Sequence, residues 1–141
     1  MAKAKDDGLR VIEVTIGNRG DSAVASMSPV DGGKRVNLRP SDKVVGEMKA
    51  RGVKSVRASW EVDANGQPQR LNVRPAKPGE PGIKVRYDVG NLRPHVHIST
   101  SDVGQVTAVG SSCICPDEQV NGDVFSFAVP IDMHFKKGET P

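Results

Sequence analysis

Hydrophobic and polar residues alternate along several short segments of the chain, and alternation with a period of two predicts half-buried β-strands. The clearest case is residues 53–62, in which Val56, Ala58, Trp60 and Val62 alternate with polar residues. Successive side chains of a strand point to opposite faces of the sheet, so these four are expected to face the core.

A tight hairpin is predicted directly after this strand. Asn65-Gly66 tolerates a positive φ at both central positions of a two-residue turn, which suits a hairpin. The returning strand covers residues 70–74, with Leu71 and Val73 facing inward. The two strands are therefore expected to be neighbours in an antiparallel sheet.

Other short strands are predicted where apolar residues alternate between turn-forming Gly, Pro, Asn and Asp. They cover residues 9–16, 23–27, 33–38, 83–89, 95–99 and 105–109. Residues 113–116 are expected to form an edge strand or a loop, and residues 116–123 a loop.

The last long apolar stretch, residues 124–135, is predicted to be one strand with a kink at Pro130. Proline lacks the N–H that a strand donates, so the strand lies at an edge, is bulged or changes sheet there. The side chains expected to form its apolar set are Phe125, Phe127, Val129, Ile131, Met133 and Phe135.

Residues 41–51 are the one segment that predicts a helix. Ser41 suits the N-cap, Asp42 suits the positive N-terminal end, and Gly52 can end the helix. The apolar stripe of this helix consists of Val44, Val45 and Met48.

The predicted fold class is therefore all-β: an antiparallel β-sandwich or jelly roll of about eight to ten short strands with one short helix. A chain of 141 residues is long enough for one ordinary domain and short for two. We expect a flexible N-terminal arm at residues 1–8, a single β domain at 9–135 and a C-terminal tail at 136–141.

The chain is mildly basic, with a formal net charge of +3 at pH 7. Part of the excess lies near the two ends, in the arm residues Lys3, Lys5, Lys136 and Lys137. This charge permits an acidic partner surface without requiring one.

The sequence carries no sign of membrane insertion or secretion. No apolar run approaches the roughly 20 residues of a membrane helix, and the polar N-terminus lacks the apolar stretch of a signal peptide. Cys113 and Cys115 would point to opposite faces of a strand, so a disulfide between them is not expected. A cytoplasmic location is expected unless the protein belongs to a virus particle.

The sequence contains no complete catalytic or cofactor motif. It lacks the GxSxG nucleophile elbow, the P-loop and the GxGxxG phosphate cradle. We therefore expect a protein that is not an enzyme and binds no cofactor. Arg19-Gly20-Asp21 matches the tripeptide that integrins recognise, although a turn favours the same residue types.

The three histidines offer a different interpretation. His95 and His97 are two residues apart, which on a strand puts both imidazoles on one face, as in many β-barrel metal sites. His134, Asp132 or Glu13 could complete a zinc or iron site. The simpler expectation is that His95 and His97 occupy the solvent-facing side of their strand and bind no metal.

Basic residues on two predicted strands define a candidate partner-binding patch. Arg70 and Arg74 lie opposite the inward residues of their strand, as do Lys84 and Arg86 on the strand at 83–89. If the two strands pair, these side chains form one positive patch that suits an acidic protein surface or phosphates. Nucleic acid is the less expected partner, because no aromatic residue falls on the outward face to stack on bases.

In its small size, its Val-, Gly- and Pro-rich composition, its polar ends and its lack of a catalytic set, the chain resembles the cement or decoration proteins that clamp the capsids of tailed bacteriophages. The resemblance implies a sandwich or jelly-roll domain that acts as a homodimer or homotrimer in the virion. It also implies that residues 1–8 and 136–141 reach onto neighbouring subunits, and that the basic patch meets acidic major capsid protein.

This resemblance favours a structural protein that binds and stabilises a larger assembly. The alternative is a small metal-binding β-barrel of the cupin type, a protein or enzyme that uses His95, His97 and His134. A carbohydrate-binding sandwich would need exposed aromatic residues, and a nucleic-acid binder would show a steep dependence of binding on salt.

Overall fold

A computed structural model describes residues 24–87, 90, 93–109 and 113–136, which form a mostly β structure. Ten short strands, all paired antiparallel, lie in three sheets beside one short helix in this part of the chain. The prediction of a mostly β domain with one helix is therefore confirmed.

The elements follow the chain in a simple order. The strands are β1 Ser26–Val30, β2 Arg35–Arg39, β3 Ser55–Val62, β4 Pro68–Pro75, β5 Ile83–Lys84, β6 Val96–Ser99, β7 Gln105–Ala108, β8 Glu118–Asn121, β9 Val124–Ala128 and β10 Met133–Lys136. A 3₁₀ turn, η2, spans Asp31–Gly33, and helix α1 spans Asp42–Ala50. Within the described residues, no helix is long and apolar enough to cross a membrane.

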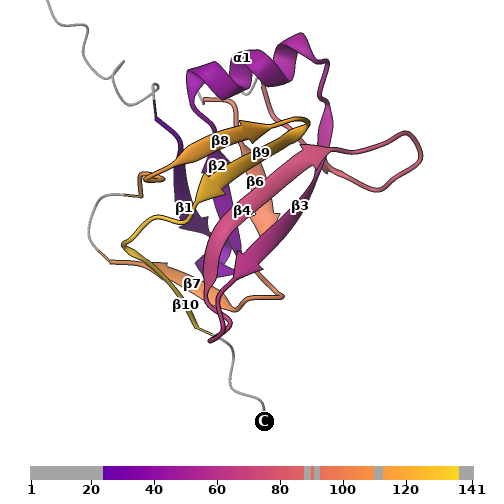
Figure 1. Cartoon of the computed structure of the whole chain (residues 1–141). Helices are drawn as coiled ribbons and strands as arrows, with labels where there is room; N and C mark the ends of the chain where they lie inside the picture. Colours follow the sequence, from indigo (N-terminus) through magenta and orange to yellow (C-terminus); the bar gives the residue numbers. More distant parts are fainter. Residues whose placement is uncertain (1–23, 88–89, 91–92, 110–112, 137–141) are drawn as a thin grey trace, which may run out of the picture.

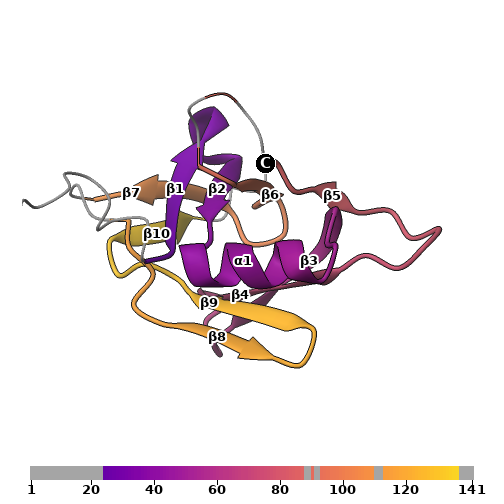
Figure 2. The ribbon, with the colours of Figure 1, turned by 90° about the horizontal axis from the view of Figure 1, so that it is seen from above.

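Two sheets face each other across the core. One has five strands in the order β5-β3-β4-β9-β8, and the other has three in the order β1-β2-β6. Figure 1 shows the five-stranded sheet in front of the three-stranded sheet, and Figure 2 shows them on opposite sides of the domain. Helix α1 lies across one end of the space between them, and the two-stranded β10-β7 sheet lies toward the other end.

Side chains from both sheets and from the helix fill the core. Phe125 and Phe127 of β9 and Leu71 of β4 are fully buried, as their alternation predicts. Buried side chains of the three-stranded sheet and of α1 in the same cluster include Met27, Val36, Leu38, Val96, Val44 and Met48. Full burial of a large apolar side chain contributes roughly 1.5–3 kcal/mol, so this shared core stabilises both sheets together.

Two side chains predicted to face inward lie at the surface instead. Val62 is 50% exposed, because the pairing of β3 with β4 shifts register between Glu61 and Val62. Ile131 is 83% exposed, because it lies in a turn in which the Met133 N–H donates to the Pro130 carbonyl at 3.1 Å. At both positions the residue is still apolar, but the regular strand geometry that would turn it toward the core has ended.

The predicted hairpin between β3 and β4 forms, but with a longer turn. The Asp63 N–H donates to the Gln67 carbonyl and the Gly66 N–H to the Asp63 carbonyl, both at 2.9 Å. Gly66 has a φ of +79°, whereas Asn65 does not have a positive φ, so only one of the two positive angles is present. The Asp63 carboxylate accepts from the N–H groups of Asn65 and Gln67 and thereby closes the loop.

Three strand predictions differ from the structure. Within the described residues 83–87, the strand predicted at 83–89 consists of β5 and a bridge between Arg86 and His95, and residues 88–89 lie outside the described residues. The loop predicted at 116–123 contains β8, which pairs with β9. The stretch at 124–135 is two strands in different sheets, so the chain changes sheet at its proline, one of the three predicted options.

The ends of the chain are described only in part. The predicted arm at 1–8, the predicted strand at 9–16 and Arg19-Gly20-Asp21 lie outside the described residues. At the other end, Lys136 belongs to β10 and not to a tail, and residues 137–141 lie outside the described residues.

Helix α1 is capped by Ser41, which also ties it to the five-stranded sheet. The Ser41 hydroxyl accepts from the Val44 N–H at 3.3 Å, as expected of an N-cap. The same hydroxyl and the Ser41 N–H donate to the carboxylate of Glu118 on β8, at 2.5 and 3.0 Å. Gly52, with a φ of +68°, follows the helix at its C-terminal end.

Gly33 makes a close contact that an added side chain would disrupt. Its φ is +88°, and a Cβ there would collide with the Val106 carbonyl oxygen, whereas Gly32, with a φ of +65°, has open space around its Cβ position.

We expect Gly32→Ala to lower the free energy of unfolding by about 1–2 kcal/mol, the cost of the left-handed backbone. Gly33→Ala should cost about 3 kcal/mol or more, because the collision adds to that cost. Urea unfolding of both variants measures the difference, and equal losses would contradict the close contact.

Candidate partner-binding surfaces

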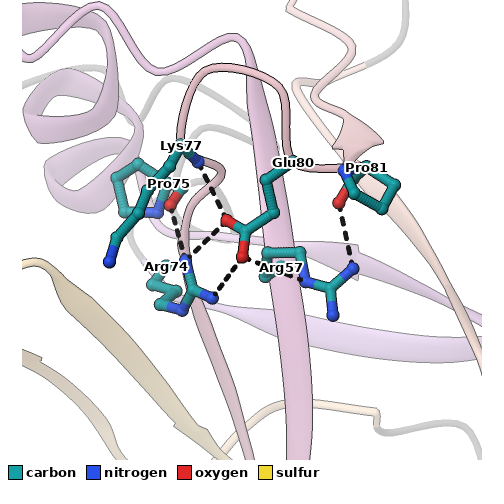
Figure 3. Close-up of polar contacts among 6 residues, drawn as sticks. All are labelled: Arg57, Arg74, Pro75, Lys77, Glu80 and Pro81. Carbon is teal, nitrogen blue, oxygen red and sulfur yellow. Dashed lines mark hydrogen bonds and ion pairs between the residues drawn. The ribbon is translucent and has the colours of Figure 1, made fainter.

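Two arginines and one glutamate form a network on the outer face of the five-stranded sheet (Figure 3). Arg57 on β3 and Arg74 on β4 are opposite each other in the strand register. Glu80, from the loop after β4, accepts two hydrogen bonds from Arg74 at 3.0 Å and lies 4.0 Å from Arg57 Nε. The Lys77 N–H also donates to Glu80, at 2.9 Å, and Arg57 donates to the Pro81 carbonyl at 3.0 Å. One carboxylate thus offsets the repulsion between two neighbouring guanidinium groups.

These contacts stabilise the charged form of Glu80. The hydrogen bond from Arg74, followed by that from the Lys77 N–H, lowers the pKa of Glu80 to about 2. The hydrogen bond to Glu80 in turn raises the pKa of Arg74. The Arg74–Glu80 pair therefore stays ionised at neutral pH.

Arg70, on the same face, is also held by a carboxylate. Its Nε donates to Ser126 Oγ at 2.7 Å, and its Nη1 lies 2.8 Å from the Asp117 carboxylate. Together with the Arg74–Glu80 pair, this gives both arginines of β4 an acidic partner within the chain. Such pairs add little to stability at a surface, but they reduce the positive potential of this face.

The two strands predicted to carry one basic patch do not pair. β3 lies between β4 and β5, so Lys84 is opposite Ser55 of β3. Arg86 lies beyond β5, where its backbone forms both hydrogen bonds of the bridge to His95. The pairing on which one joint patch depended is therefore absent from these strands, and a role of these basic residues in partner binding stays a prediction.

A small hollow lies beside the arginine–glutamate network. Its volume is about 230 Å³, and it is lined by Arg57, Ala58, Ser59, Asn72, Val73, Arg74 and Val124. Asn72 is already engaged there, since its amide donates to the Glu61 carboxylate at 2.7 Å. The hollow is smaller than the roughly 300–1,000 Å³ of typical ligand pockets.

The three histidines are not brought together as one site. His95 is buried, against the expectation of a solvent-facing side chain, and its Nδ1 donates to the Arg93 carbonyl at 2.8 Å. His97 is half-buried beside it, with ring centroids 5.1 Å apart, whereas His134 lies opposite Thr107 in the β10-β7 sheet. No group of three or more His, Cys, Asp or Glu side chains among the described residues is placed to hold a metal ion.

The outer face of the three-stranded sheet is rich in basic residues. Arg35, Asn37 and Arg39 of β2 alternate with Val36 and Leu38, which are fully buried in the core. The first three therefore lie on the other face, where Arg35 is exposed and Asn37 is buried. Sequence analysis did not single out these two arginines, although the alternation in this short strand was a signal that could have found them.

Strand β6 and the segment after β5 extend this face. His97 is opposite Asn37 in the register, and Arg86 is bridged to His95. Burial lowers the pKa of His97, and electrostatic repulsion from nearby His95, Arg35 and Arg86 lowers it further. We term the following residues the basic face: Arg35, Arg39, Arg86 and His97.

Both cysteines are free thiols. Cys115 is buried, and burial raises its pKa to about 12. Cys113 is half-buried, and burial together with the charge of Asp132 raises its pKa as well. Both thiols therefore stay protonated at neutral pH.

Three exposed aliphatic side chains lie near one corner of the domain. Val109 is 58% exposed, Ile114 48% and Ile131 83%. The Val109 N–H donates to the carbonyl of Asp132, the neighbour of Ile131, at 2.7 Å. Asp132 is also close enough to Cys113, the neighbour of Ile114, to raise its pKa. We term Val109, Ile114 and Ile131 the aliphatic corner.

Comparison with protein-family models, with curated proteins and with solved structures found no match for this chain. No family is therefore assigned to it.

Removing the Arg74 guanidinium should raise the pKa of Glu80 from about 2 toward its ordinary value of 4.5. Arg57→Met removes the 4.0 Å contact with Glu80 and the hydrogen bond to the Pro81 carbonyl, and it should raise the pKa of Glu80 less than Arg74→Met does. A lowered pKa in the folded state stabilises the protein above the unfolded pKa, and this stabilisation is lost as the pH falls from about 4.5 to about 2. NMR titration of the Glu80 carboxyl in the three proteins checks the order, and an unchanged midpoint in Arg74→Met would contradict the network.

Proposed function

We propose that this chain is a structural protein that binds and stabilises a larger assembly, and that the assembly is the capsid of a tailed bacteriophage. In that role it is a cement or decoration protein of the virion without catalytic activity. A homodimer or homotrimer clamps neighbouring copies of the major capsid protein. The two facing sheets support a β-sandwich or jelly roll as the finer description of the fold.

The aliphatic corner is the observation that carries this proposal. Apolar surface that a partner removes from water contributes about 25 cal/mol per Å², so exposed aliphatic side chains near one corner favour contact with a partner. Ile131 lies in a turn and is 83% exposed, so a hollow on a partner can receive it without rearrangement of the domain.

The β10-β7 sheet adds backbone hydrogen-bonding groups beside this corner. Among the described residues, β10 pairs with β7 and with no other strand, so its second edge is one to which an extended segment of a neighbour can add, whereas Gly33 packs closely against Val106 of β7. Lys136 is exposed at the end of β10. We include the other basic residues of the two chain ends, Lys3, Lys5 and Lys137, among those that reach neighbouring subunits.

Ile131→Asp should abolish self-association and leave the fold intact, because the wild-type side chain is mostly in solvent and a buried carboxylate opposes association. The matched control is Val62→Asp, an exposed aliphatic residue on the β3–β4 hairpin. Sedimentation equilibrium should give a dimer or trimer for wild type and control, and a monomer for Ile131→Asp.

Other results would contradict the proposal. A monomeric wild type, or an oligomer that Ile131→Asp leaves unchanged, removes the aliphatic corner as the association surface. Elemental analysis of the same untagged protein provides a second test. A monomer with one bound transition metal would favour the alternative based on His95, His97 and His134.

A further inference from the structure

We propose that the basic face of the three-stranded sheet is a docking surface for the carboxylates of an acidic protein partner. This inference deepens the proposed function, because it names the chemistry of the partner. The proposed function supplies the kind of assembly to which the partner belongs, and the docking surface itself is argued from the residues of the basic face.

Arg35 has a weak partner of its own. Its Nη2 lies 3.5 Å from the Asp31 carboxylate, four residues earlier, and the two side chains are 48% and 54% exposed. An exposed pair of this kind contributes little to stability, so a partner carboxylate can share or replace the Asp31 carboxylate at little cost. In the described part of the chain, Asp31 is the one carboxylate that forms an ion pair with the basic face.

In the five-stranded sheet, two neighbouring arginines bind a carboxylate of the same chain. There, Arg57 and Arg74 face each other across two strands and share the Glu80 carboxylate. On the opposite side of the domain, Arg35 and Arg86 lie near His97 from two different elements. A carboxylate supplied by another protein would offset the repulsion among these groups as Glu80 does on the first sheet.

The residue types on this face favour an acidic protein over nucleic acid. The outward positions of β2 and β6 carry Arg, Asn, His and Ser, which offer no broad aromatic surface for stacking bases. All five aromatic residues are in other places. Trp60 packs edge to face on Phe135, Tyr87 packs against the core, and Phe125 and Phe127 are buried.

His97 should make this docking depend on pH. The charged and titratable groups around it are His95, Arg35 and Arg86, with Asp31 beyond Arg35, and burial and the positive charges lower its pKa. A carboxylate bound beside it opposes those charges and favours protonated His97. Binding should therefore strengthen as the pH falls from about 7 to about 5, where partner carboxylates remain ionised.

Fluorescence anisotropy with labelled poly-L-glutamate tests the surface on the full chain. Arg35→Glu and Arg86→Glu should each weaken binding about tenfold, because each replaces an attraction by a repulsion. Lys43→Glu, an exposed residue of α1 outside the basic face, changes the net charge equally and should leave binding within about twofold. His97→Gln should remove most of the strengthening at low pH.

The inference is overturned if wild type does not bind poly-L-glutamate, or if Lys43→Glu weakens binding as much as the two arginine variants do. It is also overturned if a DNA duplex binds more tightly than poly-L-glutamate at the same salt concentration. Failure of the proposed function is distinguishable. Suppose that Ile131→Asp leaves self-association unchanged while Arg35→Glu weakens the binding of poly-L-glutamate. The aliphatic corner is then not the association surface, and the docking surface is still supported.

Discussion

The burial of one shared core between two facing sheets is the constraint on which the rest of the structure depends. Phe125 and Phe127 enter it from the five-stranded sheet, and Met27 and Leu38 enter it from the three-stranded sheet. Because side chains alternate along a strand, each buried residue turns its neighbours outward and so determines which polar groups each sheet presents to solvent. The two outer faces differ because the positions between the buried residues carry different polar residues in the two sheets.

The features that local patterns predicted correctly are those whose causes lie within a few residues. The N-cap hydrogen bond of Ser41 spans three residues, and the β3–β4 hairpin closes over the short loop around Gly66. Alternation likewise assigned Leu71 and Val73 to the core correctly, because both lie in a regular stretch of β4. Alternation failed where a turn or a register shift interrupted it, as at Ile131.

The features that the sequence did not predict depend on contacts between distant segments. Strand β8 has the sequence EQVN, with too few apolar residues to show a pattern, and it becomes a strand by pairing with β9 and by accepting hydrogen bonds from Ser41, 77 residues away from Glu118. The strand order that places β3 between β4 and β5 is equally non-local. For that reason, local patterning identified Arg70 and Arg74 as outward-facing and could not show that Asp117 and Glu80 neutralise them.

The outer surfaces of the domain differ in how they could contribute to partner binding. Arg70 and Arg74 of the five-stranded sheet each pair with a carboxylate of the chain, which reduces the positive potential that this face offers to a partner. Charge that is left on the basic face of the other sheet acts at longer range and favours one orientation of approach, whereas the aliphatic corner contributes free energy only on contact. A lattice of partner subunits can combine the two, because several weak contacts made at once raise the overall affinity far above that of each contact alone. Orientation by charge and retention by apolar contact are therefore expected to respond differently to salt, which weakens the first and leaves the second largely unchanged.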